Sequence, residues 1–114
     1  MKQSIESTRP CLELISICTR PDGVWHEMID SRPLHLLKQA QDAARDLRRA
    51  RISEGLFAPF RDARGSRYAR AIERVENDLE LLAHFLEDGR VDDARATVAN
   101  IHDSSSLALS PEVG

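Results

Sequence analysis

Apolar residues recur at helical spacing over a long stretch in the second half of this chain. Six of them are separated by four, three, four, three and four positions: Tyr68, Ile72, Val75, Leu79, Leu82 and Leu86. This spacing keeps all six side chains on one side of an α-helix. Gly65 and Ser66 supply a break and an N-cap in front, and Gly89 suits the position just after a helix end. The pattern therefore predicts a helix over residues 67–88 with one buried face.

The positions beside this stripe favour a helical bundle over a two-stranded coiled coil. In a heptad register the flanking e and g positions are Ala69, Glu76, Ala83, Ala71, Asp78 and Phe85. A parallel coiled coil sets each g position against the following e position of its partner, and neither resulting pair joins opposite charges. Apolar residues at e and g also widen the buried face. We therefore expect the 67–88 helix to pack inside a bundle.

The chain before this helix predicts one long helix and one short helical segment. The long helix runs from Pro33 to Glu54, with Asp30 or Ser31 as its cap and Gly55 at its end. Its expected buried face comprises Leu36, Leu37, Ala40, Ala43, Ala44, Leu47 and Ala50. Because alanine side chains are small, a neighbouring helix can approach closely. Residues 24–30 predict a short amphipathic helical turn.

Residues 12–19 fit two secondary structures. Helical spacing relates Cys11, Leu14, Ile15 and Cys18, with Thr8 as a candidate N-cap. The same segment alternates well enough for a strand, which would pair with residues 24–29 across the turn at residues 20–23. We favour the helix because a lone two-stranded hairpin is only marginally stable and no third strand is visible.

The end of the chain predicts a last helix and a flexible tail. The helix begins near Val91 and continues to about Ser104, after a turn at residues 88–90 that is short enough to make it antiparallel to the preceding helix. Residues 105–114 show no periodicity and are expected to fray. Residues 56–65, which include Phe57 and Phe60, form a connector.

These elements predict an all-α fold, a small antiparallel three- to four-helix bundle with a short irregular N-terminal region and a frayed C-terminal tail. Residues 1–104 would form a single helical domain and residues 105–114 the tail. No run of apolar residues is long enough to span a bilayer, and the N-terminus has no apolar signal segment. Cys11 and Cys18 lie too far apart on one helix for a disulfide, so we expect reduced thiols and a cytoplasmic protein.

No pattern in the chain indicates catalysis, a cofactor or a metal. The segment from His26 to Asp30 resembles a zinc-binding HExxH helix, but Asp30 replaces the second histidine. A di-iron bundle needs a Glu-x-x-His motif on each of two helices, which is absent. His35 and His102 are candidate haem ligands, but the chain has no CxxCH motif. We therefore expect a non-enzymatic protein without a cofactor or a metal.

Charge is distributed unevenly along the chain. Residues 45–74 hold nine arginines against four acids, a local charge of +5, whereas residues 75–114 hold two arginines against nine acids, a local charge of −7. Such asymmetry favours interaction with charged partners. The leading hypothesis is a non-catalytic protein–protein interaction module: an adaptor, a chaperone-like partner or a stoichiometric inhibitor. Its predicted partner-binding residues are Arg48, Arg49, Arg51, Arg67, Arg70, Glu80, Glu87, Asp88, Asp92 and Asp93.

Other interpretations of the charge pattern stay open from the sequence. The arginine-rich middle third could bind nucleic acid as part of a small regulator, although the pI of about 5.8 argues against this. The arginines could also form a solvated face or pair within the chain with the acidic residues 76–93. Finally, the two charged regions could be self-complementary, which would produce a homodimer.

Overall fold

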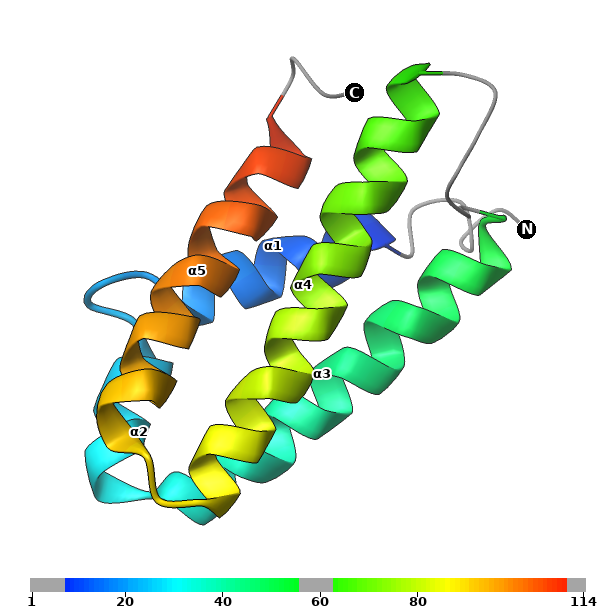
Figure 1. Ribbon diagram of the computed structural model, residues 1–114. Helices are drawn as coiled ribbons and strands as arrows, with labels where there is room; N and C mark the ends of the chain where they lie inside the picture. Colours follow the sequence, from blue (N-terminus) through cyan, green and yellow to red (C-terminus); the bar gives the residue numbers. More distant parts are fainter. Residues whose placement is uncertain (1–7, 56–62, 111–114) are drawn as a thin grey trace.

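The computed structural model describes residues 8–55 and 63–110, and in these residues it contains five helices and no strand (Figure 1). The helices are α1 (Thr8–Cys18), α2 (Val24–Ser31), α3 (Pro33–Ser53), α4 (Ala63–Glu87) and α5 (Val91–Leu109). The predicted all-α class is confirmed. The alternative hairpin of residues 12–19 with 24–29 is wrong, because α1 and α2 occupy those residues.

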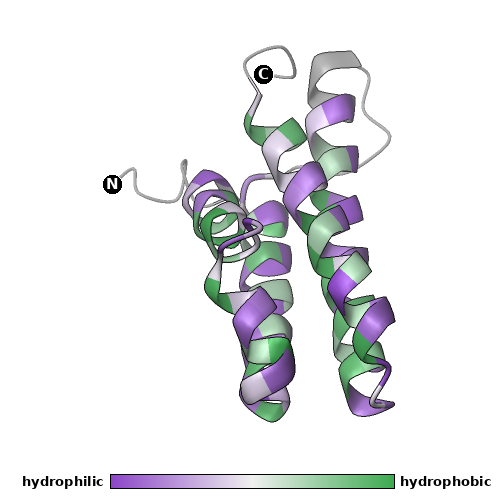
Figure 2. Cartoon of the chain, turned by 90° about the vertical axis from the view of Figure 1, so that its left-hand side faces the viewer, coloured by the Kyte–Doolittle hydropathy of each residue, from purple (hydrophilic) through white to green (hydrophobic). Residues whose placement is uncertain are grey.

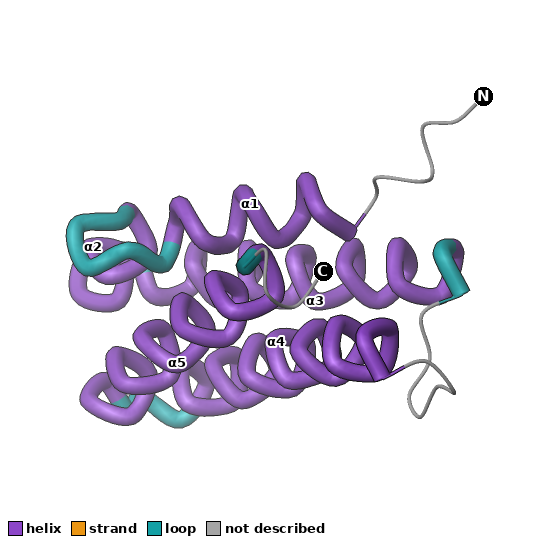
Figure 3. Tube along the Cα trace, turned by 90° about the horizontal axis from the view of Figure 1, so that it is seen from above, coloured by secondary structure: helices purple, strands orange, loops and turns teal. Residues whose placement is uncertain are grey.

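The helices pack in two layers. Seen from above, α4 and α5 lie side by side in one layer, and α1 lies beside α3 in the other (Figure 3). α4 contacts both α3 and α5, while α1 and α2 each contact α3 and α5. The short helix α2 lies at the same end of the molecule as the turn between α4 and α5 (Figure 1).

The core draws apolar side chains from all five helices, each of which carries both hydrophobic and hydrophilic residues (Figure 2). The predicted stripe of α4 is confirmed as its buried face: four members have no exposed surface, and two are partly buried against the core. The four are Ile72, Val75, Leu79 and Leu82, and the two are Tyr68 and Leu86. The small residues Ala40 and Ala44 of α3 are buried as well.

Two helix starts differ from the sequence prediction. α4 begins at Ala63, so Gly65 and Ser66 lie inside the helix and Ser66 is not its N-cap. The N-cap of α3 is Arg32 instead of Asp30 or Ser31. The reason is that α2 continues through Ser31, whose hydroxyl donates a hydrogen bond to the carbonyl of Glu27 one turn back.

The glycines predicted to end α3 and α4 do so in the left-handed conformation. Gly55 has φ +70° and Gly89 has φ +73°, a region that glycine enters without the steric penalty of a Cβ atom. α3 ends at Ser53, one residue before the predicted Glu54. α4 ends at Glu87, also one residue before its predicted end.

α5 extends further than its sequence suggests. It continues to Leu109 instead of Ser104, so the prediction that the chain frays from residue 105 onward is wrong for residues 105–109. Ser105 and Ala108 are fully buried, and the Ser105 hydroxyl donates a hydrogen bond to the carbonyl of His102. The predictions for the N-terminal residues 1–7, the connector 56–62 with Phe57 and Phe60, and the last residues 111–114 lie outside the described residues.

Candidate interaction surface

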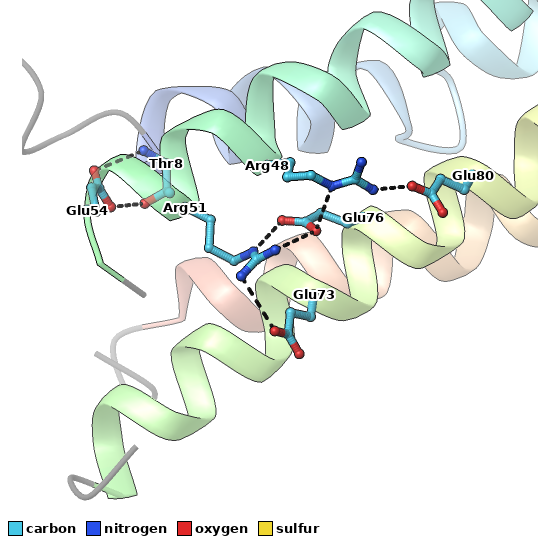
Figure 4. Close-up of polar contacts among 7 residues, drawn as sticks. All are labelled: Thr8, Arg48, Arg51, Glu54, Glu73, Glu76 and Glu80. Carbon is cyan, nitrogen blue, oxygen red and sulfur yellow. Dashed lines mark hydrogen bonds and ion pairs between the residues drawn. The ribbon is translucent and has the colours of Figure 1, made fainter. Parts of the chain in front are cut away.

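Two of the predicted partner-binding arginines, Arg48 and Arg51, turn from α3 toward α4 (Figure 4). Nε of Arg51 donates to Oε2 of Glu76 at 2.7 Å, and Nη2 donates to Oε1 of the same carboxylate at 3.3 Å. Nη1 of Arg51 lies 3.6 Å from Oε2 of Glu73. Arg48 pairs with Glu80, and its Nε lies 3.7 Å from Oε1 of Glu76. We call these five residues the α3–α4 ion-pair cluster.

The centre of this cluster is buried. The Glu76 side chain is 5% exposed and the Arg51 side chain 13% exposed. The hydrogen bond to Glu76 raises the pKa of Arg51, against the opposing effect of burial. A buried carboxylate needs compensating partners, which the two guanidinium groups supply. Arg48 and Arg51 therefore form ion pairs with acids of the same chain, and Glu80 is one of these acids.

A second polar contact joins the start of α1 to the end of α3. The backbone N–H of Thr8 donates to Oε2 of Glu54 at 3.1 Å, and its hydroxyl donates to Oε1 at 2.7 Å. The hydroxyl of Tyr68 on α4 lies 2.9 Å from Oγ1 of Thr8. Glu54 thus satisfies a free N–H at the first turn of α1 and places negative charge at its positive end. The sequence predicts Thr8 as a candidate N-cap, whereas in the structure Thr8 is the first residue of α1 and donates to Glu54. No local pattern identifies Glu54 as this partner.

Arg67, Arg70 and Arg74 lie on the outer side of α4. All three are exposed, and their spacing of three and four residues aligns them along one face of the helix. None of them forms a hydrogen bond or an ion pair with another residue in ranges 8–55 and 63–110. We call these three residues the α4 arginine stripe. Arg49, on α3, is likewise exposed and has no ion pair within the described chain.

The predicted acidic residues divide between two places. Glu80 belongs to the α3–α4 ion-pair cluster, whereas the other four lie around the turn between α4 and α5. There Asp93 pairs with Arg90 at 2.6 Å and Asp88 lies 3.5 Å from Nε2 of His84. Glu87 and Asp92 are exposed. The structure therefore does not bring the five acids into one patch.

The residues considered for metal or thiol chemistry do not form a site. No group of three or more histidine, cysteine, aspartate or glutamate residues in the described part of the chain is arranged to hold a metal ion. Cys11 and Cys18 are free and half-buried, and burial raises the pKa of both thiols. Asp46 and Glu54 raise that of Cys11 further. A raised pKa disfavours the thiolate, which is the reactive form.

Comparison of the chain with protein-family models, with curated proteins and with solved structures gives no significant match. Among the described helices, none combines the length and the apolar character that crossing a membrane requires.

Proposed function

We propose that this protein is a non-catalytic interaction module that binds an acidic surface of another protein. Its helices form an antiparallel bundle, in which α1 and α2 together take the place of one helix because each of them packs against α3 and α5. The α4 arginine stripe supplies the contact, and Arg67 and Arg70 are the two of its members that the sequence predicts as partner-binding residues. Arg48, Arg51 and Glu80 are not part of this contact, because each of them already forms an ion pair between α3 and α4.

The observation that carries this proposal is the contrast in pairing between the two arginine groups. The chain contains acids on α4 itself, and Glu73, Glu76 and Glu80 all turn toward α3. Arg67 and Arg70 are exposed and form no ion pair with these carboxylates or with any other residue that the structure describes. Arginine suits such a role because its planar guanidinium group can bind a carboxylate through two parallel hydrogen bonds.

The separation of charge along the chain supports the same function. A basic surface on a protein whose net charge is −3 produces a local field that attracts acidic partners while the rest of the molecule repels them. Complementary charge of this kind increases the association rate and fixes the orientation of the partner. The interaction is expected to weaken as salt increases, because exposed charges are screened.

Affinity capture from a nuclease-treated lysate of the source cells tests the proposal. The full chain should retain a protein partner at low salt and release it as salt rises. The double variant Arg67→Gln/Arg70→Gln should lose most of this retention. The matched control is Lys38→Gln/Arg45→Gln, which also removes two positive charges, but from exposed positions on α3. This variant should capture the partner as the original chain does.

The nucleic-acid alternative predicts a different result in the same experiment. Material retained only when nuclease is omitted, together with binding of random DNA or RNA that decreases steeply with salt, would favour nucleic acid and contradict the proposal. Equal loss of retention in both double variants would show that net charge alone matters. That outcome would also contradict a role for the α4 arginine stripe.

A further inference from the structure

Helix α2 is the shortest of the described helices, and its stability depends on its neighbours. It has eight residues, and Gly23 at its N-cap makes no side-chain hydrogen bond to its first turn. A helix of this length is not stable by itself in water. α2 contacts α3 and α5 and buries three apolar side chains, those of Trp25, Met28 and Ile29. Toward α3, Nε1 of Trp25 donates to Oε1 of Gln39 at 3.0 Å, a contact between uncharged groups.

Charged and titratable side chains gather where α2 meets α5. Nη2 of Arg95 on α5 donates to both carboxylate oxygens of Asp30 on α2, at 3.0 and 3.3 Å. His26 lies one helical turn before Asp30, so it is on the same side of α2. His102 lies two turns after Arg95, on the same side of α5. Since Asp30 faces Arg95, His26 also faces α5.

His102 is held against the end of α1. Its Nδ1 donates to the carbonyl of Ser16 at 3.1 Å, because a carbonyl oxygen can only accept. The same nitrogen lies 3.3 Å from Oγ1 of Thr19, whose hydroxyl donates to the carbonyl of Ile15. Thr19 is 1% exposed. The imidazole of His102 therefore has a fixed position at the junction of α1, α2 and α5.

The surroundings of His26 disfavour its protonated form. Burial lowers the pKa of His26 below its ordinary value of 6.5, and Arg95 and His102 on α5 lower it further. The acid one turn away on the same side of α2 is Asp30, but Arg95 already binds both of its carboxylate oxygens. A proton on His26 would therefore add a positive charge beside Arg95 in a half-buried position.

We propose that the contact between α2 and α5 is a pH-sensitive switch: it loosens when His26 takes up a proton, and Trp25 then becomes exposed. The folded protein binds this proton more weakly than a chain in which α2 has moved away from α5, because burial and Arg95 then no longer act on His26. The closed contact is therefore most stable above pH 6.5 and loses stability as the pH falls below this value. The switch does not involve the α4 arginine stripe, so the inference does not depend on the proposed function.

Acrylamide quenching of fluorescence measures the exposure of Trp25, the one tryptophan of the chain. Acrylamide is uncharged, and most carboxylates stay ionised down to about pH 5. The quenching constant should increase about twofold or more from pH 7 to pH 5, and it should recover when the pH is raised again. The raised pKa of Asp78 cannot cause this increase, because it stabilises the folded state as the pH falls.

Two glutamine variants identify the responsible histidine. His26→Gln is neutral at every pH, so its quenching constant at pH 5 should remain that of the original chain at pH 7. His35→Gln is the matched control, since His35 is an exposed histidine in the first turn of α3, and it should respond to pH as the original chain does. Circular dichroism at pH 7 checks that both variants fold.

NMR titration of the His26 imidazole tests the role of its charged neighbours. The pKa of His26 should be lower in the folded chain than in the urea-unfolded chain. Arg95→Gln should raise this pKa, and Asp30→Asn, which leaves Arg95 uncompensated, should lower it further. A quenching constant that does not change with pH, or that rises equally in His26→Gln, overturns the proposal. Equal pKa values of His26 in the folded and unfolded chains overturn it as well.

Discussion

Two groups of arginines, close in sequence, have different surroundings in the fold. Arg48 and Arg51 on α3 meet the carboxylates of Glu73, Glu76 and Glu80 across the boundary with α4 (Figure 4). Arg67 and Arg70 on α4 are exposed and form no ion pair among the described residues. The first group connects two helices, and the second adds charge to the surface.

This difference shows that a cluster of like charges in a sequence does not define one surface. Residues 45–74 contain nine arginines, but this count does not show which side of a helix each arginine occupies. What separates the two groups is whether a neighbouring helix presents acids to them. An arginine that pairs with a buried carboxylate contributes to folding, whereas an exposed arginine without such a pair contributes little to folding and remains free to bind.

The largest expected effect comes from the apolar core beneath both groups. Leu79 is fully buried on α4, so Leu79→Ala should lower the free energy of unfolding by about 2–5 kcal/mol through lost burial and the cavity left behind. Urea denaturation followed by circular dichroism measures this change. A loss below about 1 kcal/mol would contradict the burial of the α4 stripe.

The next largest effect is expected at the centre of the α3–α4 ion-pair cluster. Glu76→Ala should cost about 2–3 kcal/mol, because Arg51 loses a two-point hydrogen bond in a largely buried position. Replacing both partners by apolar residues, Arg51→Met/Glu76→Leu, should recover much of this loss, since no charge then remains desolvated. An equal or greater loss in the double variant would argue against burial as the source of the effect.

A smaller, pH-dependent effect is expected at Asp78 on α4. Burial raises the pKa of this carboxyl above its ordinary value near 3.8, and Arg74 opposes the shift. The folded state therefore binds the proton more tightly than the unfolded state, so stability is lost as pH rises from 3.8 through the raised pKa. Asp78→Asn should remove this dependence and stabilise the protein at pH 7 by less than about 0.5 kcal/mol. Thermal melting between pH 3 and pH 7 measures both, and a variant less stable than the original at pH 7 would contradict the direction of the shift.

Sequence periodicity predicts the parts of the fold that local chemistry determines. The predictions of the α4 stripe and of the glycines that end α3 and α4 are confirmed. Both depend on local sequence, because apolar residues at helical spacing mark a buried face and a positive φ favours glycine. The end of α5 is missed because residues 105–114 show no apolar periodicity, although the helix continues through Ser105 to Leu109. The helical state of residues 105–109 depends on packing in the folded molecule.

The pairing of charges is the part that the sequence does not resolve. The charge pattern allows the arginines to pair within the chain with the acidic residues 76–93, and this pairing is confirmed for Glu76 and Glu80. The choice of Arg48 and Arg51 as those partners depends on the relative position of α3 and α4. Arg51 and Glu76 are 25 residues apart with a connector between them, so no local pattern fixes which arginine reaches which acid.

One comparison of unfolding free energies tests the division of the arginines most directly. Two double variants, Arg48→Gln/Arg51→Gln and Arg67→Gln/Arg70→Gln, remove the same charge, and urea denaturation at equal ionic strength measures each against the original chain. The first should lose about 2–3 kcal/mol, because Glu76 is left buried without its guanidinium partners. The second should change by no more than about 0.5 kcal/mol. Equal losses in the two variants, or a larger loss in the second, would contradict the assignment of separate roles to the two groups.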